Sequence, residues 1–327
     1  MVSLLCTLWL LTDAPKPLVQ WKVPFSPACA LVTSDGKSLF FNDIDGYVYD
    51  ETGNLIHTLK LDFEPESAYC GPKDSVWLRG KRLMGLLNEH YRLQWQREME
   101  PPTLPPFPFQ DYLVYATEHR IQLLDPADGN ARFSSRHPHR ITGMRVWGDV
   151  LWIADSEGTL SSWDPLSGKK DLKLEGQGRA LLYMTPGPSD GLTLSYDGGL
   201  LRDMRANGSR LWQRDFHIQI SAQPIWLKGL GKPQLVVSNH ARRVLAYGQR
   251  GDQKSKTLLT GRPKALVKWS DQKCLIIPGL GKELVWYDGE TQVFFTEKLE
   301  NYQILVVENG SYVLLVDKDD IIRIYQR

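Results

Sequence analysis

Two of the seven histidines, His137 and His139, are separated by a single residue within the segment SSRHPHR at 134–140. On a strand, residues i and i+2 share a face, so the two imidazoles could bind a zinc or copper ion together. Such a site needs at least one more ligand, and the neighbouring sequence offers none at a suitable spacing. A polar loop between two structural units explains the pair more simply, and we expect neither a metal nor a cofactor.

Three arginines flank these histidines: Arg132, Arg136 and Arg140. Because a guanidinium fork matches the oxygens of a phosphate, they could form a phosphate-contacting patch, and the alternative is a solvated basic loop. Lys and Arg total 39 in the whole chain and Asp and Glu total 38, which gives a net charge of +1. This balance argues against a dedicated polyanion-binding protein, so we expect no nucleic-acid partner.

Acidic residues gather at two turns, as Asp43 with Asp45 and as Asp317 with Asp319 and Asp320. Oxygen-rich turns can hold calcium, but aspartate also stabilises a turn by bonding to its own backbone, and the second role is the simpler one. The sequence has no G-x-S-x-G elbow, no H-E-x-x-H segment and no phosphate-binding loop. These are the standard signatures of hydrolases and nucleotide-binding enzymes, and we expect a protein that is not an enzyme.

The four cysteines, Cys6, Cys29, Cys70 and Cys274, are scattered and form no C-x-x-C pair. The spacing argues against a zinc ribbon and against a thioredoxin-like redox site. Buried thiols are the simplest interpretation, and they favour a reducing compartment, so we expect a cytoplasmic protein.

Residues 1–16 contain the apolar run VSLLCTLWLL, which begins at Val2. The run is too short to span the ~30 Å hydrocarbon core as a helix, and it lacks the basic start of a signal peptide. We expect an N-terminal extension or extra strand and no membrane span. If the segment were instead a targeting remnant, the protein would be periplasmic.

The elements that must position all of these residues follow a repeat. An apolar strand, a tight polar turn and a second strand recur around positions 45, 80, 118, 157, 197, 240, 280 and 319. A second marker repeats with them, because Gly129, Gly168, Gly208 and Gly251 each lie eleven residues after a turn. Glycine and Asp-Gly turns are what tight hairpins require, since a positive φ costs little at such residues.

A unit of about 40 residues with short antiparallel strands has the size of one four-stranded propeller blade. The alternation of apolar and polar residues has period two and excludes helical repeats of similar length. We therefore predict an all-β fold with a single β-propeller over residues 17–327, with eight blades, or seven if the unit at 69–100 merges with a neighbour. The blades are expected near 24–61, 62–100, 101–138, 139–176, 177–217, 218–261, 262–300 and 301–327 plus 17–23.

The two ends of the chain decide the blade count. The last unit supplies three strands, at 303–308, 312–317 and 321–326, and the chain then stops. The segment PLVQWKV at 17–23 can supply the fourth strand. Its pairing with 321–326 would complete the last blade and leave no bare sheet edge.

The blade ends carry a sequence motif that resembles the repeat of quinoprotein-like propellers, the pyrroloquinoline-quinone type. It occurs as DGYVYDETGN at 45–54, as EGTLSSWD at 157–164 and as WYDGET at 286–291, and Trp95 and Trp212 match the packing tryptophan of that repeat. The chain is also similar to tryptophan–aspartate repeat propellers. The resemblance implies a quinone-dependent oxidoreductase as one function, but the adjacent cysteines that flank the quinone in those enzymes are absent, and no residue carries over as a cofactor ligand.

We predict instead a non-enzymatic protein–protein interaction scaffold, one subunit of a bacterial multi-protein assembly. The single-domain form resembles the propeller members of systems that also contain AAA+ ATPases of the MoxR type and von Willebrand factor A proteins, which makes such proteins the expected partners. The alternative is a propeller like the lipoprotein that serves outer-membrane assembly in the bacterial envelope.

Partner contacts are expected where the connections depart from the short pattern, at 64–73, 101–110, 186–191 and 228–232. Loops on a rigid frame can specialise, whereas strands must pack. The candidate contact residues are apolar and costly to expose, and they are Tyr69, Leu104, Phe107, Phe109 and Leu230. The alternative is that these side chains cap the ends of the core.

Overall fold

The structure is a computed structural model of the chain. It describes residues 17–71, 75–147, 150–164, 167–176, 178–188, 191–205, 209–228, 232–280, 283–288, 292–298, 305–308, 312–316 and 319–326. Two compact units are present: one holds Pro15–Ile141 with Asn301–Arg327, and the other holds Thr142–Glu300.

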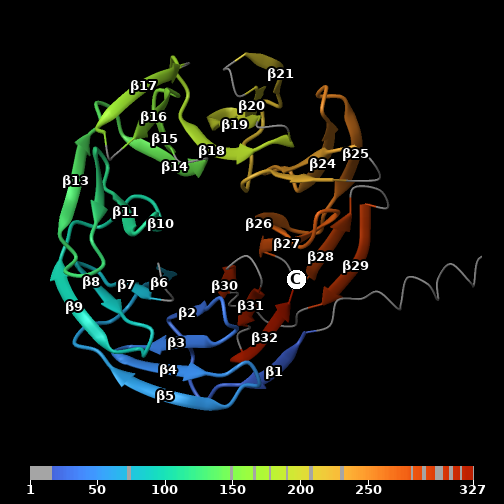
Figure 1. Cartoon of the computed structure of the whole chain (residues 1–327). Coiled ribbons are helices and arrows are strands. Elements are labelled where there is room, and N and C mark those ends of the chain that lie inside the picture. Colours follow the sequence, from blue (N-terminus) through green and yellow to red (C-terminus); the bar gives the residue numbers. More distant parts are fainter. Residues whose placement is uncertain are drawn as a thin grey trace, which may run out of the picture. The chain divides into compact units, whose positions relative to one another are not determined.

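The first unit contains four antiparallel sheets of four strands each, which we number as blades one, two, three and eight. The strands are β2 (Cys29–Val32), β3 (Ser38–Asn42), β4 (Asp45–Tyr49) and β5 (Leu55–Lys60) in blade one; β6 (Ser67–Cys70), β7 (Val76–Arg79), β8 (Leu83–Leu87) and β9 (Leu93–Glu98) in blade two; β10 (Phe107–Phe109), β11 (Tyr112–Ala116), β12 (Arg120–Leu124) and β13 (Ala131–Arg136) in blade three; and β30 (Leu305–Glu308), β31 (Tyr312–Val316), β32 (Ile321–Gln326) and β1 (Val19–Lys22) in blade eight. Figure 1 shows the strands of each sheet side by side, with β5, β9 and β13 on the outer side of this unit.

The second unit contains blades four to seven, again of four antiparallel strands. The strands are β14 (Ile141–Trp147), β15 (Val150–Asp155), β16 (Leu160–Asp164) and β17 (Lys169–Leu174) in blade four; β18 (Leu181–Pro186), β19 (Leu192–Tyr196), β20 (Leu200–Met204) and β21 (Arg210–Asp215) in blade five; β22 (Ile225–Leu227), β23 (Gln234–Ser238), β24 (Arg243–Gly248) and β25 (Gln253–Leu258) in blade six; and β26 (Arg262–Lys268), β27 (Lys273–Leu280), β28 (Glu283–Asp288) and β29 (Gln292–Lys298) in blade seven. The predicted all-β fold with eight four-stranded blades is confirmed, and the seven-blade alternative is wrong because β6–β9 form a sheet of their own.

Blade eight joins the two ends of the described chain in one sheet. Strand β1 pairs antiparallel with β32, with Val19 opposite Ile324 and Lys22 opposite Ile321. The backbone N–H of Leu18 adds a bond of 2.7 Å to the Ile324 carbonyl. The edge of β32 is therefore covered, as the sequence predicts.

Middle strands such as β3 carry the core, whereas a fourth strand such as β9 faces solvent on one side. In β3 the residues Leu39, Phe40 and Phe41 are each fully buried. An apolar run of this kind marks a strand that is covered on both faces, whereas β9 alternates between half-buried and exposed positions. The strand pattern in the sequence thus follows the layer that each strand occupies.

A tryptophan on the fourth strand of one blade packs against a glycine of the next blade within the same unit. Gly129 has a φ of +68°, and a Cβ atom placed there would lie 2.7 Å from the Trp95 ring. Gly251 has a φ of +74°, and its Cβ would lie 2.8 Å from Trp212. Only glycine permits both this backbone conformation and so close an approach by an indole.

An arginine two residues after each of these tryptophans completes the contact. Arg97 donates a hydrogen bond of 2.9 Å to the Gly129 carbonyl, and Arg214 donates one of 3.2 Å to the Gly251 carbonyl. The i and i+2 positions of a strand share a face, so indole and guanidinium approach the same turn. The Trp95 indole also donates to the Pro126 carbonyl at 2.8 Å.

Several fourth strands contain a β-bulge at their second residue. In blade two, Trp95 pairs with Leu86 and Leu93 pairs with Leu87, which leaves Gln94 out of register. The same irregularity leaves Arg132 out of register in blade three and Leu211 in blade five. A bulge turns its extra residue away from the ladder, and the Leu211 side chain is 44% exposed.

Removal of β1 tests the shared blade. A chain lacking residues 1–23 should aggregate or lose its cooperative thermal transition, because the edge of β32 becomes free to pair with other molecules. A chain lacking residues 1–16 keeps β1 and serves as the control. If both truncated chains melt as the parent does, β1 does not hold blade eight together.

Two glycines separate the cost of backbone strain from the cost of losing the indole contact. Gly129→Ala should lower the free energy of unfolding by about 2–4 kcal/mol, since a left-handed alanine is strained and its Cβ collides with Trp95. Gly168→Ala introduces the same strain, at a φ of +72°, but nothing lies within 4 Å of its Cβ, so about 1–2 kcal/mol is expected. Urea unfolding measures both values, and equal losses would show that the tryptophan contact contributes little.

Candidate functional site

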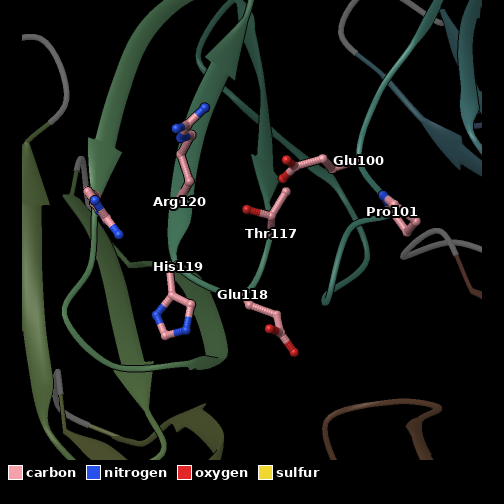
Figure 2. A pocket seen from close by; sticks show the side chains of 7 residues that line it. Glu100, Pro101, Thr117, Glu118, His119 and Arg120 are labelled. Atoms are coloured by element: carbon pink, nitrogen blue, oxygen red, sulfur yellow. The ribbon is translucent and has the colours of Figure 1, made fainter.

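A hollow of about 500 Å³ lies at the turn between β11 and β12 in blade three. It is lined by the turn residues Glu118 and His119, by Arg120 and Arg136, and by Glu100 on the connection that follows β9. Figure 2 shows His119 and Arg120 on one side of the hollow, Glu100 and Pro101 on the other, and Thr117 between them.

Two neighbouring hollows share residues with this one and extend it into a trough. One, of about 460 Å³, shares Glu100 and Arg120 and continues along blade three to Gly129. The other, of about 500 Å³, shares His119 and Arg136 and continues to His137. We call the three together the blade-three trough, and all of its lining residues belong to the first unit.

The period-two geometry of the strands places the charged residues of the trough. Arg120 and Gln122 share a face of β12, and their register partners on β13 are Arg136 and Ser134. Two arginines therefore stand directly opposite each other at one end of the trough, and the uncharged Gln122 lines it two residues after Arg120.

The arginines that the sequence grouped together have different partners. Arg132, at the bulge, contacts Asp125 at 2.9 Å and Asp128 at 2.8 Å. Arg140 lies 3.8 Å from Glu118 across the turn. Arg136 alone of the three lines the trough, so the structure does not bring them together as one patch.

Tyr115 anchors the connection between β9 and β10 against blade three. Its hydroxyl donates to the carbonyl of Glu100, and the backbone N–H of Thr103 donates to the Ala116 carbonyl at 2.9 Å. Burial raises the pKa of Tyr115, so the phenol remains protonated and can donate. These bonds hold Glu100 at the rim of the trough.

The two spaced histidines are not arranged as a ligand pair. The Nδ1 atom of His137 lies 3.1 Å from the backbone carbonyl of His139, and the His137 side chain is 6% exposed whereas His139 is exposed. Among the described residues no three His, Cys, Asp or Glu side chains are grouped so that they could hold a metal ion.

The predicted partner-contact residues divide by burial. Tyr69 on β6, Leu104 on the β9–β10 connection and Phe107 on β10 are half-buried, while Phe109 is 3% exposed within the core. Strands β6 and β10 are neighbours, so Tyr69 and Phe107 come from adjoining strands of one unit. Leu230 lies outside the described residues.

Strand β10 lies within the stretch 101–110 that the sequence predicts to be a connection. Phe107 pairs with Val114 and Phe109 with Tyr112, so the alternating FPF segment forms the edge strand of blade three. An edge strand tolerates the missing N–H of Pro108.

The thiols and turn aspartates have structural surroundings. Burial raises the pKa of Cys29 to about 12 and raises that of Cys274 as well, which disfavours the reactive thiolate. Asp320 accepts a hydrogen bond of 2.7 Å from the Ser26 hydroxyl, and Asp45 stands opposite Lys60 in register. Asp317 lies outside the described residues.

A buried carboxyl in blade five has a strongly perturbed pKa. Asp203 is 3% exposed and accepts a hydrogen bond of 2.9 Å from the Thr193 hydroxyl, which in turn accepts one of 2.9 Å from the Trp226 indole. Burial raises the pKa of Asp203 to about 6. The chain of bonds runs from β22 through β19 to β20, inside the second unit, and links blades five and six.

His119 and Arg120 line the trough, although the sequence alone does not single them out. Both belong to the turn at 118, whose local pattern indicates only a repeat marker. The register partner of Arg120 is Arg136, sixteen residues away at the end of the next strand, so no local motif links the two. A comparison of the charged residues at the equivalent turns of all repeats could have identified Arg120.

No helix long and apolar enough to cross a membrane is found among the described residues.

No protein-family model and no curated protein matches the sequence. Solved structures do match. BamB from Moraxella catarrhalis is similar over 91% of this chain and 83% of its own, with a TM-score of 0.58 and 13% identity. Saccharomyces cerevisiae Sqt1 is similar over 96% and 99%, with a TM-score of 0.74 and 11% identity. The computationally designed Ika8 protein is similar over 95% and 100%, with a TM-score of 0.71 and 13% identity. At these identities the likeness shows the fold alone.

Asp203 makes stability depend on pH. Its folded pKa of about 6 lies above the ordinary value of 3.8, so its favourable contribution is complete below pH 4 and is lost as the pH rises through 6. A pKa raised to this extent corresponds to about 3 kcal/mol of difference between the protonated and ionised forms. Asp203→Asn should therefore match the parent at pH 4 and be more stable by up to that amount at pH 7.5, as urea unfolding would measure.

Asp111→Asn changes an exposed aspartate in the other unit and is the control for this comparison. Both variants remove one carboxylate, so comparison of their pH profiles isolates the effect of the buried position of Asp203. A difference between Asp203→Asn and the parent that does not change with pH would contradict the assignment of the raised pKa to this carboxyl.

Proposed function

We propose that this chain is a non-enzymatic protein-interaction scaffold. The observation that carries the proposal is the surface of the first unit, where half-buried apolar residues and a charged trough occur on adjoining elements. Leu104 lies on the connection whose residues Glu100 and Pro101 line the trough, and Phe107 begins the strand that follows. Apolar anchors beside a polar rim are typical of protein interfaces.

The chemistry of the trough supports binding of a protein surface. Its lining carries both signs of charge, with Arg97, Arg120 and Arg136 against Glu98 and Glu100. Strands and the bonded connection hold these groups in place, which lowers the cost of ordering them when a partner binds. The perturbed carboxyl of Asp203 lies inside a sheet, so it has no access to a substrate.

A finer assignment also belongs to this proposal: the repeat is of the quinoprotein-like type. The contacts of Trp95 with Gly129 and of Trp212 with Gly251 support it, because the tryptophans that match the packing tryptophan of that repeat in sequence also pack between blades in the structure. We propose in addition that the chain is a cytoplasmic subunit of a bacterial multi-protein assembly, for which an AAA+ ATPase or a von Willebrand factor A protein is the partner to test first.

Three alanine variants test the interaction. Affinity purification of the tagged chain with mass spectrometry should recover a specific partner, and Phe107→Ala should lose it with a small change in melting temperature, because the side chain is half-buried. Phe109→Ala should instead lower the free energy of unfolding by about 3–5 kcal/mol, as for a phenylalanine removed from a core.

Leu258→Ala is the matched control for Phe107→Ala. Leu258 is 68% exposed on β25, in the unit that does not contain the trough, so Leu258→Ala removes exposed apolar surface that is not part of the trough lining. It should retain the partner. The proposal fails if no specific partner is recovered, or if Phe107→Ala and Leu258→Ala bind it equally well.

A further inference from the structure

The opposed arginines of the blade-three trough are an exception among the blades. The position where Arg120 faces Arg136 is the first register pair between the third and fourth strands. The register joins residue types of opposite charge there in blade one, as Asp45 with Lys60, and in blade seven, as Glu283 with Lys298. The remaining blades place at least one apolar residue at this position, in the pairs Leu83–Glu98, Leu160–Leu174, Leu200–Asp215, Arg243–Leu258 and Ile321–Lys22.

Like charges directly opposite on neighbouring strands destabilise a sheet. Blade three does not compensate for this through Arg120 itself, since no ion pair joins Arg120 to a carboxylate in the part of the chain that the structure describes. The nearby carboxylate of Glu118 lies against Arg140, and Figure 2 shows it directed away from Arg120.

Arg132 differs from Arg120 because it has carboxylate partners. Arg132 lies on the same strand as Arg136 and contacts two aspartates. The two aspartates that neutralise Arg132, Asp125 and Asp128, lie at the other end of β13, beside the bulge. The Arg120 guanidinium at the trough can therefore take its carboxylate from outside the chain.

We infer that Arg120, which stands opposite Arg136 in register, is the donor of an oxyanion site that binds a carboxylate in an acidic segment of the partner protein. This inference rests on the proposed function and specifies which chemical group of the partner protein is bound, a side-chain carboxylate. A guanidinium fork binds a carboxylate in a bidentate geometry, and the register places a second positive charge, that of Arg136, opposite Arg120. The trough that they line is open and of a size that admits side chains of a bound segment.

The rest of the lining selects a protein segment over a polyanion. Glu100 and Glu98 stand along the same trough and would repel a nucleic-acid backbone or a polyphosphate chain. A peptide carries its carboxylates singly and offers backbone N–H groups, from which the Glu100 carboxylate and the Gln122 amide oxygen can accept hydrogen bonds.

Charge-matched variants of the full chain test the site. The probe is a short fluorescein-labelled peptide with a single Glu among Ser residues, and its affinity is measured by fluorescence anisotropy at low salt. Arg120→Gln should weaken binding by about tenfold or more, as expected for a lost charge-assisted hydrogen-bond pair. Arg132→Gln removes the same charge outside the trough and should change the affinity less than about twofold.

Arg120→Glu separates loss of the site from loss of the fold. It places opposite charges in register, as blade one does with Asp45 and Lys60, so its melting temperature should equal or exceed that of the parent while peptide binding is abolished. A lower melting temperature together with unchanged binding would overturn the site.

Three further outcomes would also overturn it: a parent chain that does not bind the peptide, equal weakening by Arg120→Gln and Arg132→Gln, or tighter binding of the matched phosphoserine peptide, which would assign the site to phosphate. The partner experiment distinguishes the two proposals. If the partner is recovered equally well by the parent and by Arg120→Gln, the oxyanion site is wrong and the scaffold function stands; if no partner is recovered, the scaffold function is wrong whatever the peptide does.

Discussion

The stacking of a fourth-strand tryptophan on a left-handed glycine is the contact on which the other features depend. It joins the outer edge of one blade to a turn of the next, as Trp95 does with Gly129 and Trp212 with Gly251. The indole needs a backbone without a Cβ, and the arginine two residues later needs the glycine carbonyl to face it. Aromatic burial of this kind dominates packing energies, so blade two is held to blade three, and blade five to blade six, edge to turn. The trough occupies the surface beside one such junction, where Arg97 and Gly129 both line it.

Much of the fold could be predicted because its signals are local. Turn residues such as Asp45 and Gly46 lie between apolar runs, so the hairpins, the repeat and the blade count follow from spacing alone. The pairing of β1 with β32 is distant in sequence, but it could be predicted because the last repeat lacks one strand. The sequence predicts a connection where β10 lies, since the segment is short and contains Pro108, and a proline-rich stretch gives no strand signal until its edge position is known.

The trough could not be predicted because it depends on register. A shift of one residue moves every side chain to the other face, and the bulge at Arg132 makes such a shift within β13. In the sequence Arg132 and Arg136 look equivalent, because residues four positions apart lie on the same face of a regular strand. The bulge removes the equivalence: one arginine reaches the turn aspartates, and the other remains opposite Arg120.

The repeat constrains only the residues that must pack, and this explains how an unfavourable pair can persist. The middle strands of blade three bury Leu113, Val114, Ile121 and Leu123 completely, so their packing sets the register whatever the exposed residues are. Burial of four such side chains contributes about 6–12 kcal/mol, against about 1 kcal/mol for a like-charge pair near water. A blade can therefore hold two arginines in opposition without losing its structure. Functional sites are expected where residues violate a local rule of stability and the packing of the rest of the fold offsets the lost free energy. In this chain that position lies where the sheet of blade three borders the β11–β12 turn.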